Sequence, residues 1–256
     1  MSRRTIVDIL KMKNQSPIAM LTAYDFPTAR MLDEAGVDIL LVGDSLGNVV
    51  YGEDDTLGVS VDDIVRHARA VARATQGALV VADMPFGSYQ ASAAAAVNHA
   101  ARMLSEGRAQ AVKLEGGTAV APTLRRLVEI GVPVMGHVGL TPQSVHQLVG
   151  YRIQGKTTLE AKKIFEDAKA VEKSGAFAVV LECVEPELAK TITQELAIPT
   201  IGIGSGPSCD GQVLVTNDLM GLTVSPVPKF VEPLADLRPL ITETARRFCE
   251  KVKSPR

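Results

Sequence analysis

The sequence predicts an α/β fold, a single (β/α)8 TIM barrel that occupies residues 1–256 as one catalytic domain. Short aliphatic runs follow one another along the chain, about eight in all, and segments of helical pattern separate most of them. Runs without polar alternation are typical of strands buried on both faces of a parallel sheet. Several of these runs end abruptly in an acid, a lysine or a histidine. A chain of 256 residues suits one such barrel, so two smaller domains and a doubly wound sheet are the alternatives.

The first half of the chain supplies the start of the barrel. A short helix is expected over 5–13, where Ile6, Ile9 and Leu10 share one side and can cover the barrel bottom. Ser60 can cap a helix that starts at Val61, and acids in its first turn suit the helix dipole. The remaining expectations are strands at 18–22, 38–42 and 78–82, helices at 27–35 and 92–105, and a long loop at 46–56 of the kind that often closes over a site.

The second half repeats the same design. Strands are expected at 111–115, 133–139, 177–181 and 200–204, with helices at 120–130, at 159–173 and from Pro186 onward. A second long loop occupies 140–156, and the last strand, 212–215, has the weakest pattern. The terminal helix, 233–253, contains Pro239 and is expected to be kinked or broken there.

Composition argues against several classes of protein. Lys and Arg number 27 against 29 Asp and Glu, without blocks of like charge, so nucleic acid and anionic membranes are not expected partners. No apolar segment of membrane-spanning length and no signal-peptide pattern occurs, which predicts a soluble cytoplasmic protein. The three cysteines, Cys183, Cys209 and Cys249, are an odd number without metal-ligand spacing and are expected to be reduced thiols.

Polar side chains gather where the aliphatic runs end. The runs end, in order, at Asp44-Ser45, Asp83, Lys113-x-Glu115, His137 and Glu182. Any one of these residues alone is more often a cap or a turn residue than a functional one. On one rim of a parallel barrel, however, the acids would crowd together, and a bound cation is the simplest way to offset their repulsion. Oxygen ligands without zinc-like Cys or His spacing favour Mg²⁺.

Structural interpretations compete with each functional one. Lys113 could merely balance the buried carboxylates, and His137 could be a hydrogen-bonded core residue. Cys183 beside Glu182 is more readily a packed thiol than a nucleophile, because no base is placed for it. The glycines of the 202–206 segment could form a phosphate-binding turn or only make room for a neighbouring backbone.

Longer strings carry a resemblance to a known family. The matches run in order from about Thr22 to Phe230. The strings are LTAYD (21–25), LVGDSLG (41–47), ADMPF (82–86), VKLEGG (112–117), GHVGLTPQ (136–143), GYRIQG (150–155), GIGSG (202–206) and DGQVLV (210–215). In these strings the chain closely resembles the ketopantoate hydroxymethyltransferases. One departure is Asn217 before Asp218, where the family pattern has His.

The resemblance implies a specific reaction. Members are (β/α)8 barrels that use Mg²⁺ to transfer a hydroxymethyl group from 5,10-methylenetetrahydrofolate to 3-methyl-2-oxobutanoate through a Mg-stabilised enolate, giving 2-dehydropantoate for pantothenate and coenzyme A biosynthesis. Carried over by position, the resemblance implies a metal set of Asp44, Asp83 and Glu115, an oxo-acid set of Asp44, Ser45, Asp83, Lys113 and His137, and Glu182 as the base. It also implies a homodecamer, a pentamer of dimers. The folate contacts cannot be assigned from the sequence.

Two rival functions share parts of this pattern. A Mg²⁺-dependent lyase that breaks a C–C bond of a hydroxy diacid would use the same metal logic, but it does not account for the full set of strings. The second rival is a catalytically inactive barrel that acts as a scaffold or regulatory binder. Replacement of one of the matching acids would favour this interpretation, but all of them are present.

Overall fold

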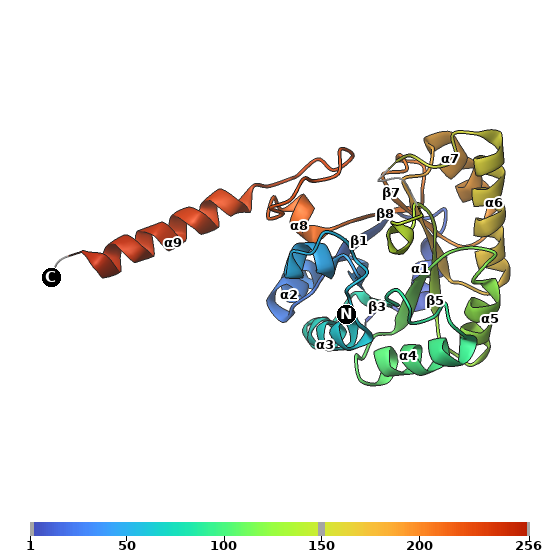
Figure 1. Ribbon diagram of the computed structural model, residues 1–256, viewed down its shortest axis with the longest axis horizontal. Coiled ribbons are helices and arrows are strands. Elements are labelled where there is room, and N and C mark those ends of the chain that lie inside the picture. The colour runs from blue at the N-terminus through green and yellow to red at the C-terminus, as the bar shows by residue number, and fades with distance from the viewer. Residues whose placement is uncertain (1–2, 148–151, 255–256) are drawn as a thin grey trace. The chain divides into compact units, whose positions relative to one another are not determined.

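Eight parallel strands close into a barrel in sequence order, β1 to β8, with helices around its outside (Figure 1). The computed structural model describes residues 3–147 and 152–254. The strands are β1 Ile18–Thr22, β2 Ile39–Val42, β3 Leu79–Asp83, β4 Ala111–Glu115, β5 Val134–Gly139, β6 Ala178–Glu182, β7 Thr200–Ile203 and β8 Gly211–Leu214. The predicted barrel is confirmed, including the weakly patterned last strand, which pairs in parallel with β7.

Helices follow the strands as predicted, and several of them begin at a side-chain cap. They are α1 Ile6–Met12, α2 Phe26–Glu34, α3 Val61–Ala74, α4 Ala93–Ser105, α5 Ala121–Glu129, α6 Thr158–Lys173, α7 Pro186–Glu195, α8 Thr216–Leu219 and α9 Leu237–Lys253. Ser60 caps α3 through a reciprocal box with Asp63, in which each side chain accepts the other residue's backbone N–H. Asp25 caps α2 in the same position, so this helix begins at Phe26.

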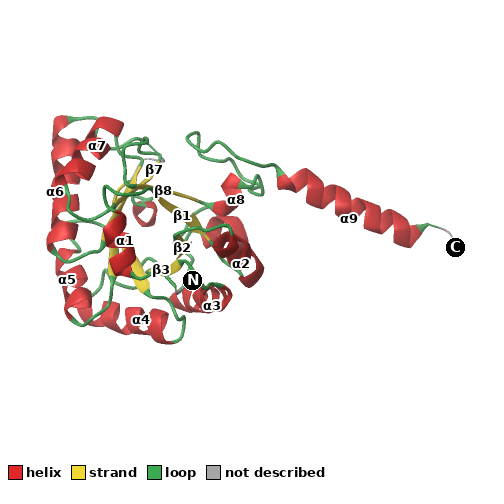
Figure 2. Ribbon diagram, turned by 180° about the vertical axis from the view of Figure 1, so that it is seen from behind, coloured by secondary structure: helices red, strands yellow, loops and turns green. Residues whose placement is uncertain are grey.

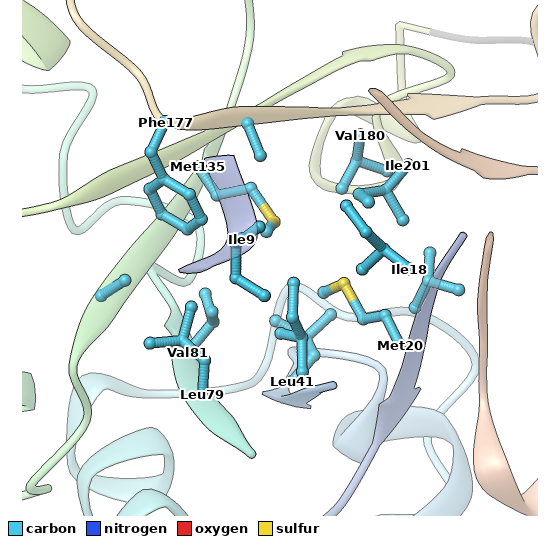
Figure 3. Close-up of a cluster of buried hydrophobic side chains, with 14 residues drawn as sticks. Ile9, Ile18, Met20, Leu41, Leu79, Val81, Met135, Phe177, Val180 and Ile201 are labelled. Carbon is cyan, nitrogen blue, oxygen red and sulfur yellow. The ribbon is translucent and has the colours of Figure 1, made fainter. Parts of the chain in front are cut away.

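The apolar core fills the end of the barrel where the strands begin. Side chains from β1 to β8 form one buried cluster there, and Figure 3 shows them converging from the surrounding strands. Ile18, Ile39, Leu79, Ala111 and Ala178, the first residues of five strands, all belong to it. The larger side chains of the cluster, Val, Leu, Ile, Met and Phe, contribute about 1.5 to 3 kcal/mol each when fully buried. This end of the barrel is therefore a packed base, and polar chemistry is left to the opposite end.

Helix α1 closes that base. Its Ile9 is fully buried at the centre of the cluster, and Ile6, Leu10 and Met12 pack against the same side chains. Figure 2 shows α1 lying across the barrel at this end. Thr5 and Asp8 form a capping box that starts the helix. The prediction of a short N-terminal helix covering the barrel bottom is confirmed.

Two details of the predicted elements are wrong. The segment 46–56 is not simply a loop, because Gly47–Tyr51 forms a π-helical turn, η1, which ends at Gly52 in a left-handed conformation with φ of 74°. The terminal helix α9 begins at Leu237, and Pro239 does not break it. Proline is tolerated in the first turn because the N–H groups there have no acceptor within the helix.

The chain divides into two compact units, residues 1–213 and 214–256. In the second unit, the backbone N–H groups of Leu222 and Thr223 donate to the Asn217 carbonyl, so the turn after α8 uses the main chain of Asn217. No residue of α9 is buried, and several of its apolar residues are exposed, among them Ile241, Phe248 and Val252. The prediction that residues 1–256 form a single catalytic domain remains a prediction.

Candidate active site

The predicted site residues meet at the end of the barrel where the strands finish. Asp44 follows β2, and the others stand on β3 to β6: Asp83, Lys113, Glu115, His137 and Glu182. All six are buried although all are ionisable. Groups of this type are rarely buried unless they are paired or used. Their convergence is a consequence of parallel strands that end at one rim.

Strand register places these side chains beside one another. Asp83 of β3 pairs with Lys113 of β4, and Glu115 pairs with His137 of β5. Lys113 and Glu115 are two residues apart, so they lie on the same side of their strand. A shift of the register by one residue would turn both away from the site.

An ion pair joins the first two strands of the site. The Lys113 Nζ atom lies 2.9 Å from Asp83 Oδ2, and both side chains are buried. The same Asp83 oxygen accepts the backbone N–H of Asp44 at 3.3 Å. Burial alone would lower the pKa of Lys113, but the carboxylates of Asp83, Glu115 and Asp44 outweigh burial and raise it. Lys113 therefore stays charged and is the cation that faces the crowded acids.

His137 is neutral in this arrangement. Burial lowers its pKa, and the neighbouring Lys113 ammonium lowers it further. The Nδ1 atom lies 3.3 Å from Lys113 Nζ, which can only donate, so we assign Nδ1 as the acceptor and place the ring proton on Nε2. Nε2 lies 3.3 Å from Glu182 Oε2, although the angle is not that of a hydrogen bond. The uncharged ring thus lies between Lys113 and Glu182.

The carboxylates bear the cost of this burial. Burial raises the pKa of Asp83 to about 7, with Lys113 opposing the rise and the Asp44 charge adding to it. Burial, followed by the charge of Asp44, raises the pKa of Glu115 well above its ordinary value. Asp83 and Glu115 therefore bind protons near neutral pH, and a cation bound to these carboxylates could replace those protons.

The donor set fits a hard divalent cation. Asp83 Oδ1 is a buried carboxylate oxygen that accepts no hydrogen bond, which leaves it available as a ligand. In the part of the chain that the structure describes, no group of three or more Asp, Glu, His or Cys side chains already stands in metal-holding geometry. Mg²⁺ commonly takes one or two carboxylates and keeps water and substrate oxygens as its other ligands. Asp44 and Asp83, with Glu115 through water, fit that type of site.

The end of β6 is held tightly around Glu182. The next residue, Cys183, has a left-handed φ of 48°, which is rare outside glycine and asparagine. Ser205 accepts the Val184 N–H at 2.9 Å and donates to the Leu181 carbonyl at 2.7 Å, so it clamps both sides of the bend. The Ser205 hydroxyl is thus used within the fold, which favours the structural interpretation of the glycine-rich 202–206 segment.

The Cys183 thiol and the Ser45 hydroxyl lie outside the charged network. Burial and the Glu182 charge raise the pKa of Cys183 to about 12, which agrees with a packed thiol rather than a nucleophile. Cys183, Cys209 and Cys249 are all free thiols. Ser45 is half-buried, and its Oγ lies 2.9 Å from the Tyr24 hydroxyl. It stands at the mouth beside Asp44, as predicted, but outside the charged network.

Sequence reasoning missed two buried residues at the site. Gln143, in the short helical turn η2 Pro142–Ser144, contacts both Asp44 and Glu115. Tyr89, in the loop after β3, contacts Glu115 and Gln143. Gln143 ends one of the family strings, but neither residue has a local pattern that indicates these contacts. The string at 150–155 falls partly outside the described residues.

Comparison with known proteins places the chain in a family. The family model described as ketopantoate hydroxymethyltransferase matches residues 3–256. The chain belongs to the ketopantoate hydroxymethyltransferase family. It is 54% identical over 251 residues to the 3-methyl-2-oxobutanoate hydroxymethyltransferase of Pelobacter propionicus, covering 98% of this chain and 93% of the relative. The corresponding enzyme of Carboxydothermus hydrogenoformans is 53% identical over 254 residues, covering 99% and 92%.

Membership in the ketopantoate hydroxymethyltransferase family makes the chain a hydroxymethyl-transferring enzyme. Solved structures agree on the fold alone. Phosphoenolpyruvate phosphomutase from Streptomyces platensis subsp. rosaceus has a TM-score of 0.66 at 12% identity, covering 98% of this chain and 88% of that one. A 2,3-dimethylmalate lyase of the PEP mutase/isocitrate lyase superfamily has a TM-score of 0.59 at 18% identity, covering 97% and 87%.

Among residues 3–147 and 152–254, no helix is both long enough and apolar enough to span a membrane.

Proposed function

We propose that the enzyme transfers the one-carbon unit of 5,10-methylenetetrahydrofolate to 3-methyl-2-oxobutanoate and forms 2-dehydropantoate. The observation that carries this proposal is the buried network that runs from Asp44 through Asp83, Lys113 and His137 to Glu182. It combines cation ligands, a fixed positive charge and a carboxylate base within one rim. An oxo acid that must lose a proton beside its ketone needs these three elements.

The metal proposed for this site is Mg²⁺, held by Asp44, Asp83 and Glu115, directly or through water. When bound, it would supply Lewis acidity that polarises the ketone and acidifies the C3–H, an effect of several kcal/mol. The oxygen-only donor set and the unbonded Asp83 Oδ1 support this choice. The raised pKa of Asp83 means that metal binding competes with a proton below about pH 7.

The chain's own residues would divide the proton and charge handling. Glu182 would take the proton from C3, because it ends β6 at the rim and the clamped bend after it fixes its backbone. The Lys113 ammonium would face the negative charge of the oxo acid and the charge that develops on proton loss. Ser45 would donate to the oxo acid from the rim, and neutral His137 would line the same space. C3 would then bond to the one-carbon unit as the two bonds from that unit to the folate nitrogens break. A water molecule would supply the hydroxyl oxygen, and the protons from C3 and from the water would end on the two nitrogens of tetrahydrofolate. Both substrates must therefore be held face to face.

The direct test is a folate-dependent assay with purified protein. Incubation with 3-methyl-2-oxobutanoate, 5,10-methylenetetrahydrofolate and Mg²⁺ should produce 2-dehydropantoate. The amount of product is measured by mass spectrometry. A lyase on the same barrel would instead cleave a hydroxy diacid, and a scaffold would turn over neither substrate. Absence of product with native, folded protein would refute the proposed reaction.

Removing the metal should stop turnover. We expect that EDTA abolishes product formation and that added Mg²⁺ restores it, because the buried carboxylates lose the cation that offsets their charge and activates the ketone. The measurement is the initial rate in the same assay before EDTA, after EDTA and after Mg²⁺ in excess of the chelator. Full activity in rigorously metal-free protein would contradict the metal assignment.

We also propose that the enzyme is a homo-oligomer, a pentamer of dimers, and acts in the cytoplasm. Helix α9 supports self-association, since Ile241, Phe248 and Val252 repeat at helical spacing and are all more than half exposed. Exposed apolar faces of this kind commonly mark interfaces, and a second copy is the partner we assign to it. The three free thiols suit a reducing compartment.

Charging the α9 face should dissociate the assembly. Phe248→Glu places a carboxylate within the apolar face, and we expect a smaller species than the wild type by size exclusion with light scattering. Arg246→Glu is the control, because Arg246 lies toward the polar side of the helix and forms only an exposed ion pair with Glu243. Equal masses for Phe248→Glu and the wild type would show that α9 is not the interface.

A further inference from the structure

One buried residue, Gln143, bridges two carboxylates of the proposed metal site. The Gln143 backbone N–H donates to Glu115 Oε2 at 3.1 Å, and its side-chain Nε2 donates to Asp44 Oδ2 at 2.9 Å. Gln143 is only 3% exposed, so water does not compete for these contacts. Gln143 thus contacts both Asp44 and Glu115 from the turn η2, which adjoins neither β2 nor β4 in the sequence.

The orientation of the Gln143 amide follows from its partners. Nε2 lies 2.9 Å from a carboxylate oxygen and 3.0 Å from the Met84 carbonyl, and both of these groups can only accept. The amide nitrogen must therefore face them, and the amide oxygen must face the other way. A rotated amide would place its one oxygen against these two acceptors and leave both of them without this donor.

Tyr89 holds the other side of this amide. Its hydroxyl lies 2.9 Å from Gln143 Oε1 and 3.0 Å from the Glu115 carbonyl, and it accepts the Glu115 backbone N–H at 3.1 Å. Tyr89 is 1% exposed and is among the largest fully buried side chains. Tyr89 therefore fixes both Gln143 and the end of β4.

We propose that Gln143 and Tyr89 are positioning residues for the cation: together they hold Asp44 and Glu115 in the orientation that binds it. This inference rests on the proposed function. With Asp44 Oδ2 engaged by Gln143, the other carboxylate oxygen is left to the cation, and Glu115 is held through both its backbone and its side chain. Without these donors, mutual repulsion between two buried acids would turn them apart in the empty site. Outer-shell hydrogen bonds of this type commonly contribute 10- to 100-fold to metal affinity.

The test measures metal binding without turnover. Mn²⁺, which takes similar oxygen ligands, is titrated into substrate-free protein and its dissociation constant is read by electron paramagnetic resonance. Gln143→Met keeps the length of the side chain and the backbone N–H but removes the side-chain amide nitrogen and oxygen, and we expect Mn²⁺ binding to weaken about 10- to 100-fold. Tyr89→Phe removes one oxygen atom, and we expect a loss on the order of 10-fold, the lower end of that range.

Matched controls separate positioning from general stability. Gln110→Met removes a glutamine whose Oε1 accepts the Val80 N–H at the opposite end of the barrel, and Tyr51→Phe removes an exposed hydroxyl bonded to Asp63. Neither should change the Mn²⁺ dissociation constant, even where urea unfolding shows lost stability.

Each outcome decides the matter. Weaker Mn²⁺ binding by Gln143→Met or Tyr89→Phe, with both controls unchanged, supports the proposal; should Gln143→Met fail to fold, Tyr89→Phe alone decides. Wild-type Mn²⁺ affinity in the folded variants would overturn the positioning role and leave the proposed function standing. If wild-type protein itself binds no Mn²⁺, the metal assignment falls and this inference falls with it.

Discussion

Glu182→Gln should nearly abolish exchange of the C3 proton of 3-methyl-2-oxobutanoate with deuterium. Glutamine keeps the shape of the side chain but cannot accept the proton, and positioned general bases typically contribute about 10²- to 10⁴-fold. The exchange is followed by proton NMR in D₂O, with Mg²⁺ present and folate absent, so that only proton removal is measured. Binding of the metal and the oxo acid should persist, because Glu182 is not among their proposed ligands.

A neighbouring carboxylate provides the control for this experiment. Glu185 caps α7 by accepting the Leu188 N–H at 2.9 Å and takes no part in the site network. Glu185→Gln should leave the exchange rate unchanged. Exchange at the wild-type rate in Glu182→Gln would show that another group is the base.

The barrel could be predicted because its strands carry strong local signals. The runs of β2, β3 and β6 are aliphatic, and every residue of these strands is buried. The polar residues that end them therefore had to meet at one rim once the strands were parallel. The same-side placement of Lys113 and Glu115 also follows from strand alternation alone. These features depend on short-range pattern and on one topological rule.

What the sequence could not predict depends on contacts between distant segments. Gln143 and Asp44 are 99 residues apart, and Tyr89 and Gln143 are 54 apart, so only closure of the barrel brings them together. The π-helical turn η1 is a different case, because glycine, asparagine and valine are weak helix formers. Close packing within its own segment accompanies it: a Cβ on Gly47 would lie 3.0 Å from the Asp55 carbonyl oxygen.

Lys113→Met should destabilise the metal-free enzyme by about 3 to 5 kcal/mol at pH 8, the usual cost of removing one partner of a buried ion pair. The Lys113 ammonium, 2.9 Å from Asp83, is the cation that faces Asp83, Asp44 and Glu115. Methionine fills a similar volume, so the loss is chiefly electrostatic. The measurement is the free energy of unfolding in urea, with EDTA present so that no metal substitutes for the lysine.

The pH dependence of this variant distinguishes lost charge from lost packing. An acid whose folded pKa lies above its unfolded value makes stability fall as pH rises between the two. For Asp83 in the wild type, that window runs from about 4 to about 7. Removing the Lys113 charge raises the folded pKa of Asp83 and so extends this window to higher pH. The free energy of unfolding of the variant should therefore keep falling between pH 7 and 9, by up to about 1.4 kcal/mol per pH unit. In the wild type, Asp83 no longer contributes to the pH dependence in that range.

Lys13→Met is the matched control for that slope, because Lys13 forms a buried ion pair with Asp210 at 2.8 Å, away from the site. Asp210 also accepts the N–H and the hydroxyl of Thr200, so its charge stays hydrogen-bonded when Lys13 is removed. This control should therefore lose stability without the added slope above pH 7. If the free energies of unfolding of Lys113→Met and the wild type changed in parallel from pH 7 to 9, Asp83 would not depend on Lys113 for its charge. In that case the role of Lys113 would be confined to the substrate.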